Sequence, residues 1–371
     1  MIIGVLKEPA PEKRVAILPE HIAQFTKWQC TVLVEDGAGN QACAGNEAYI
    51  QAGAKVVSRN QLMQEAQLLI CINAVKPNDA GQCKASVLLG TFQALNNAAL
   101  IKNFAEANLT VFSMEMLPRT TRAQSMDVLS SQANIAGYKA VLLAANLYPR
   151  YFPMFITAAG SIPPAKVLIL GAGVAGLQAI ATAKRLGAVI EVFDTRPAVK
   201  EEVMSLGGKF IEVEGAADAS KAGGYAVEQS AEFMQRQKNK IAESVAKADI
   251  VITTAQIPGK KAPVLITDEM LQAMKNGSVI IDLAASTGGN TSQTQNGKTH
   301  VYHNVTIAGN SSLADDMPAD ASKLYGKNIL NFLQLLWDKE GNFKLNFEDD
   351  LVKGCCVAHN GTLSNEKLLT R

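Results

Sequence analysis

The feature that most constrains the fold is a glycine-rich turn between a predicted strand and a predicted helix. Residues 167–176 read VLILGAGVAG, with Gly171, Gly173 and Gly176 in GxGxxG spacing, and LQAIATAKRLG continues as the helix. In this context the first glycine permits the tight turn, the second lets the backbone approach a pyrophosphate, and the third lets helix and strand pack closely. The free N–H groups of the helix N-terminus bind the anion. The pattern predicts a Rossmann-type unit that binds a dinucleotide.

A carboxylate follows at the position that reads the adenosine ribose in such units. The next predicted strand, AVIEVFD, ends at Asp194, 18 residues after Gly176. A carboxylate there accepts hydrogen bonds from both ribose hydroxyls and repels a 2′-phosphate, although Arg196 can compensate for that charge. Asp194 therefore favours NAD over NADP. The alternative interpretation is that Asp194 only caps the helix expected at Pro197.

A second α/β unit is predicted ahead of this one. Within the first 112 residues, apolar runs alternate with segments whose apolar residues have helical spacing. The runs are IIGVL, TVLVE, KVV, LLICI, SVLLG and LTVFS. Repeated strand and helix predict a parallel sheet covered on both faces. With 371 residues and about 150 residues per domain, two domains are expected.

The boundary between the domains is predicted within a long helix. The segment SMDVLSSQANIAGYKAVLLAANL at 125–147 has a helical pattern, and MPADASKLYGKNILNFLQLLW after Asp315 is amphipathic and expected to pack back on the first domain. We therefore assign residues 1–134 and 316–371 to a first Rossmann-like domain and 135–315 to the NAD-binding Rossmann domain. The predicted fold class is α/β, with two parallel sheets joined by long helices and a cleft between the domains.

Composition excludes several classes of protein. Lysine and arginine number 35 against 34 aspartate and glutamate, and 48% of residues are apolar, which argues against disorder and against a polybasic surface for nucleic acid. The uncharged stretch 167–183 contains three glycines and a glutamine and is not expected to span a membrane. The N-terminus does not resemble a secretory signal, so a cytoplasmic location is expected.

Metal sites and disulfides are not predicted. The six cysteines have no CxxC spacing, and only four histidines are present, so neither a zinc site nor a disulfide framework is indicated. His300 and His303 lie in KTHVYHNVTI, which looks like a strand after a turn, and both are expected to be surface histidines.

Three segments resemble one family of nicotinamide enzymes. They are KEPAPEKRVAILPE at 7–20, PRTTRAQSMDVLSSQANIAGYKAV at 118–141 and GAGVAGLQAIATAKRLGA at 171–188. They are similar to domain I, the NAD(H)-binding component of the alpha subunit, of proton-translocating NAD(P) transhydrogenase. The resemblance covers essentially the whole chain, and alanine dehydrogenase shares the fold of this family.

The resemblance implies that the middle segment forms a loop beside the bound nicotinamide. The family's Arg, Gln, Asp and Ser at this place match Arg119, Gln124, Asp127 and Ser130, which are the expected catalytic residues. Hydride transfer needs two nicotinamide rings with their reacting carbons about 3–3.5 Å apart. By resemblance, Gln124 also reaches the ribose of the partner's nucleotide, whereas Asp127 and Ser130 hold the loop and the carboxamide. The alternative is that PRTTRAQSMD is only a basic loop and a helix cap.

The same matching implies further contacts with NAD(H). Gly223 and the two residues after it match a mobile flap that closes over the nucleotide in this family, although the segment can also be a solvent loop before a helix. The full predicted cofactor-binding set is Arg119, Thr120, Thr121, Gln124, Gly171, Gly173, Val174, Gly176, Asp194, Thr195, Arg196, Gly224, Tyr225, Gln237 and Gln256.

The function implied is reversible hydride transfer between NADH bound here and NADP⁺ bound on a partner subunit. The resemblance implies a homodimer, an NADP(H)-binding domain III, and a membrane domain II that couples the reaction to proton translocation. The chain itself is expected to have no membrane span and no nucleic-acid partner, and to lie peripherally on the cytoplasmic face of the inner membrane.

Two alternatives differ in chemistry. An alanine dehydrogenase needs a carboxylate clamp and proton-transferring groups, and Arg14 matches the clamp. However, Val75 stands where the dehydrogenase lysine is expected, with Lys76 displaced by one, and Gln93 stands near the expected histidine. Ser286 stands at the expected aspartate, and these side chains do not transfer protons near neutral pH.

The second alternative is a non-catalytic NAD(H)-binding module. Such a module has no reason to keep Arg119, Gln124 and Asp127 on the nicotinamide side, so we consider it less favoured. One departure from the family lies at 309–322, where Asp315 and Asp316 replace a small and basic stretch.

Overall fold

The computed structural model describes residues 1–73, 75–76, 79, 83–213, 230–257, 259–338 and 341–369. Contacts divide the chain into two compact units, Met1–Gln132 with Asp315–Arg371, and Ala133–Ala314. Helix α6 (Val128–Leu147) crosses the first boundary. The boundaries predicted from the sequence, 134/135 and 315/316, differ from these by at most two residues.

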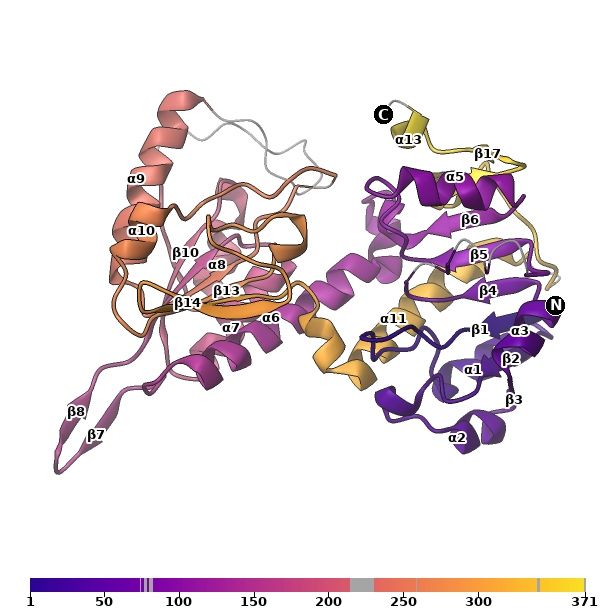
Figure 1. Ribbon diagram of the computed structural model, residues 1–371, viewed down its shortest axis with the longest axis horizontal. Helices are drawn as coiled ribbons and strands as arrows, with labels where there is room; N and C mark the ends of the chain where they lie inside the picture. Colours follow the sequence, from indigo (N-terminus) through magenta and orange to yellow (C-terminus); the bar gives the residue numbers. More distant parts are fainter. Residues whose placement is uncertain are drawn as a thin grey trace. The chain divides into compact units, whose positions relative to one another are not determined.

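The first unit is built on a mainly parallel sheet (Figure 1). The six predicted apolar runs all form strands, and they pair in parallel because each is followed by a crossover connection. Two C-terminal strands, β16 and β17, extend the sheet in antiparallel pairing next to β6. The strand order is β17 (Thr362–Leu363), β16 (Cys356–His359), β6 (Thr110–Ser113), β5 (Val87–Gly90), β4 (Leu68–Ile70), β1 (Ile2–Val5), β2 (Thr31–Glu35) and β3 (Lys55–Val57).

Apolar residues on both faces of this sheet are buried, as its continuous apolar strands predict. In β4, Leu68 and Ile70 belong to one core cluster and Leu69 to the other, because successive side chains of a strand point to opposite faces. The prediction that the C-terminal amphipathic helix packs on this unit is confirmed, since Tyr325 and Phe332 of α11 lie in its core. The helices are α1 (Pro19–Lys27), α2 (Asn46–Gln51), α3 (Arg59–Glu65), α5 (Ala98–Glu106), α11 (Pro318–Leu333), α12 (Asp350–Cys355) and α13 (Glu366–Leu369).

The second unit has the strand order of a doubly wound sheet. From β9 the chain adds β10 and β11 on one side and then β12, β13 and β15 on the other, so the order reverses next to β9. In such sheets ligands bind outside the carboxyl ends of the strands at this reversal. The strands run β11 (Lys209–Phe210), β10 (Val189–Phe193), β9 (Lys166–Leu170), β12 (Ile250–Thr253), β13 (Val279–Asp282), β15 (Val305–Gly309) and β14 (Lys298–Tyr302).

Helices cover both faces of the second sheet. Helices α7 (Val174–Arg185) and α8 (Lys200–Ser205) pack with part of α6 on one face. Helices α9 (Ala231–Lys247) and α10 (Asp268–Gln272) pack on the other. The hairpin of β7 (Phe155–Thr157) and β8 (Gly160–Ile162) projects from this unit, and all six of its strand residues are exposed (Figure 1).

Two details at 298–309 correct the sequence-based expectation. The segment forms two antiparallel strands rather than one, because His303 and Asn304 adopt positive φ angles of 46° and 60° and reverse the chain. His303 is exposed as expected, whereas His300 is half-buried, with both ring nitrogens buried without a hydrogen-bond partner. The sequence did not indicate the second strand because the two-residue turn, His303 and Asn304, lacks the glycine that usually marks a hairpin turn.

Candidate dinucleotide site

Two of the three motif glycines are required by the protein's own backbone. Gly171 follows β9 with φ of +105°, and a Cβ there would lie 2.4 Å from Oγ1 of Thr254. A Cβ on Gly176 would lie 1.9 Å from the carbonyl oxygen of Gly171. Real Cβ atoms do not approach so closely, so a side chain at position 176 would push α7 away from the end of β9. The close packing predicted for the third glycine is confirmed in its geometry.

The middle glycine has no such constraint. Gly173 is the N-cap residue of α7 with φ of −77°, and a Cβ on it would meet nothing within 4 Å. The space beside the first turn of α7 is therefore open, and the first N–H groups of a helix lack acceptors within the helix. An anionic group fits this arrangement.

The first turn of α7 is also held from behind. A Cβ on Gly137 of α6 would lie 2.1 Å from the carbonyl oxygen of Ala175, so the two helices touch through their backbones. The first turn of α7 is thus supported on both sides by glycine contacts, one with β9 and one with α6.

Asp194 links the end of β10 to the glycine turn. Its carboxylate accepts hydrogen bonds from the backbone N–H of Ala172 at 2.7 Å and of Arg196 at 2.8 Å. The Arg196 guanidinium donates to the same carboxylate through Nε and Nη2, both at 2.9 Å. Asp194 is not the cap of the following 3₁₀ turn, Pro197–Val199, whose N-cap residue is Arg196. A ribose at Asp194 would have to share the carboxylate with Arg196.

A buried polar network shapes the neighbouring strand ends, and the sequence analysis missed it. Asn290 is fully buried, and its side chain pairs with the backbone N–H and C=O of Ala255 at 3.0 and 2.9 Å. Its own N–H donates to Asp282 at 2.6 Å. Asn290 thereby fixes the loop after β12, where the side chain of Gln256 donates to the carbonyl of Leu283 at 2.9 Å. A buried aspartate at a strand end is the signal in IIDLA that could have indicated it.

Five more residues are predicted to contact the cofactor, and three of them lie in the described part of the chain. Val174 begins α7 and is 39% exposed, and Thr195 is half-buried between Asp194 and Arg196. Gln237 is half-buried on α9. Gly224 and Tyr225 lie outside the described residues.

The loop matched to the nicotinamide side contains a helix cap. Asp127 precedes α6 and accepts hydrogen bonds from the Ser130 N–H at 3.0 Å and the Ser130 hydroxyl at 2.6 Å. The two residues therefore hold each other and the start of α6. This geometry agrees with both interpretations of the segment, since a cap also fixes the loop before it.

The remaining residues of the loop alternate between buried and exposed positions. Ala123 and Met126 are buried in the core of the first unit, with 2% and 6% exposure. The exposed polar residues around them include Arg119, Thr120, Thr121 and Gln124. The loop is thus anchored by apolar residues and turns its polar residues outward.

Arg14 lies in a buried network of charged groups. Its guanidinium donates to Glu12 from Nε at 2.8 Å and from Nη2 at 2.7 Å, and to Gln132 from Nη1 at 2.8 Å. Nε also lies 3.0 Å from Asp315. The neighbouring Lys13 pairs with Asp316 at 2.8 Å. Asp315 and Asp316 thus both pair with basic residues of the N-terminal motif.

Burial raises the pKa of two carboxyl groups in and beside this network. Burial raises the pKa of Glu8 to about 7, although the N–H groups of Ile72 and Asn73 donate to it at 2.6 and 3.0 Å. Burial likewise raises the pKa of Asp315 to about 6 against the effect of Arg14. For Glu12 the bonds from Arg14 outweigh burial, and its pKa is lowered.

The three positions matched to the proton-transferring residues of alanine dehydrogenase lie outside this charged network. Val75 is 5% exposed and packs in the apolar core. Gln93 is exposed and has φ of 50°. Ser286 is exposed, and its N–H donates to the Ser311 hydroxyl at 2.8 Å.

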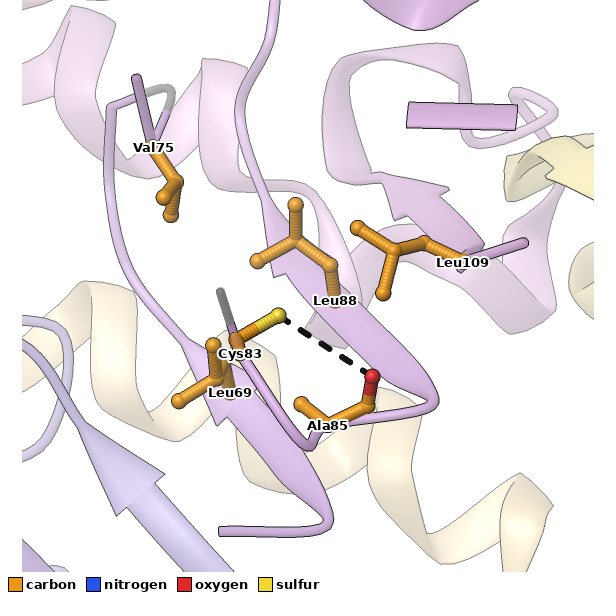
Figure 2. Close-up of a pocket in the computed structure, with 6 residues that line it drawn as sticks. All are labelled: Leu69, Val75, Cys83, Ala85, Leu88 and Leu109. Carbon is orange, nitrogen blue, oxygen red and sulfur yellow. Dashed lines mark hydrogen bonds between the residues drawn. The ribbon is translucent and has the colours of Figure 1, made fainter. Parts of the chain in front are cut away.

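A small hollow elsewhere in the first unit does not resemble a ligand site. Its lining is mainly apolar, and the Cys83 sulfur points toward the carbonyl of Ala85 at 4.0 Å (Figure 2). Among the residues that the structure describes, no charged side chain lines it, whereas ligand sites combine apolar walls with converging polar groups. The residues that line it are Leu69, Val75, Cys83, Ala85, Leu88 and Leu109.

The fold and the glycine turn define the class: a two-unit α/β protein whose second unit is of the doubly wound, nucleotide-binding type. Models of the alanine dehydrogenase/PNT family match the chain, the N-terminal domain over residues 4–136 and the C-terminal domain over 140–366. The chain belongs to this family.

Relatives within the family point to one branch. The chain is 45% identical over 379 residues to the first part of NAD(P) transhydrogenase subunit alpha of Rhodospirillum rubrum, with 99% of each chain covered. A solved transhydrogenase from Sinorhizobium meliloti superposes with a TM-score of 0.89 at 43% identity, covering 98% of this chain and 100% of that one. An L-alanine dehydrogenase structure shares the fold, with a TM-score of 0.83 at 22% identity over 100% of this chain and 98% of that one.

No helix in the described residues combines the length and the apolar character that a bilayer crossing requires.

We predict that the free energy of unfolding of the first unit falls as the pH rises from about 4.5 to about 7. The folded unit binds a proton at Glu8 in this range that the unfolded chain has released, so raising the pH favours unfolding. The pKa change from 4.5 to about 7 corresponds to about 3 kcal/mol. Asp315, whose pKa is raised to about 6, contributes a loss of the same sign, so Glu8→Gln should remove only the part that Glu8 contributes.

Tryptophan fluorescence during urea unfolding at pH 5 and pH 8 measures the effect in the first unit, because both tryptophans, Trp28 and Trp337, lie there and stack at 4.7 Å. The exposed Glu106→Gln is the matched control. Equal pH dependence in native protein and Glu8→Gln would contradict the prediction.

Proposed function

We propose that the chain is the NAD(H)-binding component of a proton-translocating NAD(P) transhydrogenase. In this function it holds NADH for direct, reversible hydride transfer to NADP⁺ on a partner subunit. The observation that carries the proposal is the 118–127 loop, which exposes Arg119 and Gln124 while Ala123 and Met126 are buried. Family membership and 45% identity to the first part of a transhydrogenase subunit alpha support it.

The second unit fits NAD(H) in its phosphate and ribose positions. The open space at Gly173 accommodates a pyrophosphate beside the start of α7, and Asp194 offers carboxylate oxygens to an adenosine ribose. When bound, the nicotinamide supplies or accepts the hydride. We assign the cofactor contacts to the residues matched from the sequence, including Gln256 and, outside the described residues, Gly224 and Tyr225.

The chain's own residues would orient the reacting ring rather than transfer protons. Arg119 and Gln124 carry donors that can hold a carboxamide and ribose hydroxyls, and Asp127 with Ser130 fixes the end of the loop. Hydride exchange between two nicotinamides requires no proton transfer in the chemical step, so a site without His, Lys or Asp bases suffices. Orientation and exclusion of water are then the catalytic contributions.

The alternative of an alanine dehydrogenase is disfavoured by the state of Arg14. All its donating nitrogens are engaged with Glu12, Gln132 and Asp315, which leaves an incoming substrate carboxylate to compete with two buried carboxylates. The non-catalytic alternative predicts NADH binding without any hydride transfer to a partner.

We further propose the partners and location that this function requires. The relative's name designates only the first part of subunit alpha and so supports the existence of other parts, which we identify as an NADP(H)-binding domain III and a membrane domain II. The chain would lie peripherally on the cytoplasmic face of the inner membrane. Exposed apolar residues of the β7–β8 hairpin support a homodimer, with Met154, Phe155 and Ile156 at 60%, 44% and 73% exposure.

The central test mixes the purified chain with a transhydrogenase NADP-binding domain and follows the reduction of an NAD analogue by NADPH. Alanine with NAD is the control reaction. Turnover with alanine alone would favour the dehydrogenase, and NADH binding without transfer would favour the non-catalytic module.

We predict that Gln124→Asn slows hydride transfer at least tenfold while the Kd of NADH changes less than threefold, because the shorter side chain misplaces the ring without removing the binding contacts of the second unit. Stopped-flow kinetics and calorimetry measure the two quantities. The exposed Gln51→Asn on α2 is the matched control. Equal losses in rate and affinity would count against this role.

We predict that Gly173→Ala weakens NADH binding at least tenfold and leaves the melting temperature within about 2 °C, because the added Cβ meets no protein atom within 4 Å but enters the space assigned to the pyrophosphate. Gly45→Ala, whose Cβ also meets nothing within 4 Å, controls for the substitution itself. Unchanged NADH affinity would remove Gly173 from the site.

We predict that Ile156→Asp raises the dissociation constant of the homodimer at least tenfold, because it places a charge in an apolar contact. Sedimentation velocity measures the oligomeric state. Val301→Asp is the control, at a side chain that is 66% exposed against 73% for Ile156. A dimer unaffected by the hairpin substitution would exclude the hairpin from the interface.

A further inference from the structure

The 118–127 loop is bound to a helix far away in the sequence. Arg122 donates to Asp349 with both terminal nitrogens, Nη1 to Oδ2 and Nη2 to Oδ1, each at 2.7 Å, across 227 residues of sequence. It also contacts Asp350. Paired bonds of this kind fix the direction of the guanidinium as well as its distance from the carboxylate.

Asp349 is itself held rigidly. It is the N-cap residue of α12, and its Oδ1 accepts hydrogen bonds from the backbone N–H of Leu351 at 2.9 Å and of Val352 at 3.4 Å. The bonds from Arg122 lower the pKa of Asp349, so the carboxylate is charged near neutral pH. The loop is therefore tied to the first turn of a helix rather than to a mobile side chain.

The same helix touches the start of the loop directly. A Cβ on Gly354 of α12 would lie 2.4 Å from Cγ of Pro118. On the other side of the loop, the carbonyl of Ser125 accepts hydrogen bonds from Asn328 and Asn331 of α11, both at 2.8 Å. The loop is thus fixed at 118, 122 and 125.

These fixed positions alternate with the exposed polar residues. Arg119, Thr120 and Thr121 lie between the contacts at 118 and 122, and Gln124 lies between those at 122 and 125. A shift of Arg122 would therefore move the residues on both sides of it. Displacement of about 1 Å in a reacting geometry can cost on the order of a hundredfold in rate.

We propose that Arg122 and Asp349 are positioning residues for hydride transfer, through which α12 holds Arg119 and Gln124 in the reactive geometry. The inference rests on the proposed function. It assigns a role in the chemistry to a C-terminal helix that contributes none of the matched site residues.

The test uses Asp349→Asn, which removes the charge that Arg122 pairs with and keeps a side chain that caps helices well, so the fold is retained. We expect hydride transfer to the NADP-binding domain to slow at least tenfold, while the Kd of NADH stays within twofold. We also expect cleavage by trypsin after Arg119, followed by mass spectrometry, to accelerate at least threefold because the loop is released.

Glu348→Gln is the matched control, because it removes an equal charge from the exposed residue just before Asp349, whereas Arg122 bonds to Asp349 and Asp350. We expect its rate to stay within twofold of the native rate. Arg122→Gln should reproduce Asp349→Asn, and the double variant should be no slower than either single one. Arg122→Lys should recover some of the rate through a single contact.

An unchanged rate in Asp349→Asn, with the native chain active, would overturn this inference and leave the proposed function standing. A loss of rate matched by an equal loss of NADH affinity, or one without faster cleavage after Arg119, would also overturn it. A native chain that transfers no hydride to the partner domain would instead overturn the proposed function.

Discussion

The arrangement of the first unit depends on the bonds that Arg14 makes to the points where the chain leaves it and returns. Gln132 is the last residue of the unit's first segment and Asp315 is the first residue of its second, and the guanidinium contacts both. The charge is largely buried, with the Arg14 side chain 12% exposed, and Glu12 compensates it from the same turn of chain. Breaking a buried pair leaves an uncompensated charge, which typically costs about 3–5 kcal/mol. One side chain therefore ties together the two segments that make up this unit.

These bonds explain how Arg14, which matches the arginine that binds the substrate carboxylate in alanine dehydrogenase, can serve a structural purpose. Each of the three guanidinium nitrogens of Arg14 already bonds to the protein, and Asp315 adds a second acid to Glu12, so a small carboxylate would have to compete for the guanidinium. The acidic residues Asp315 and Asp316 thus have a structural account in their pairing with Arg14 and Lys13. Burial raises the pKa of Glu8 and of Asp315, and the charge of Glu12 adds to both shifts.

Both candidate ligand-facing segments are built by the same physical means. In each, backbone or apolar contacts hold a short segment from behind and leave groups for hydrogen bonding exposed. At the glycine turn the contacts are those of Gly171, Gly176 and Gly137, and the open position is Gly173. In the 118–127 loop, Ala123 and Met126 are buried and Gln124 is exposed. Precise placement needs this rigidity, because orientation is the main contribution that such a site can make.

The sequence by itself determined the parallel strands of the first unit, the helices on either side of the domain boundary and the glycine turn, because apolar periodicity and backbone freedom at glycine are local properties. It did not determine the antiparallel strand β14, whose turn residues His303 and Asn304 carry no glycine. The partners of Arg14, Arg122 and Asp194 were decided only by the tertiary structure. A charged side chain has no periodic signal, and its partner can lie 227 residues away, as Asp349 does from Arg122, so only the folded chain determines which charges meet.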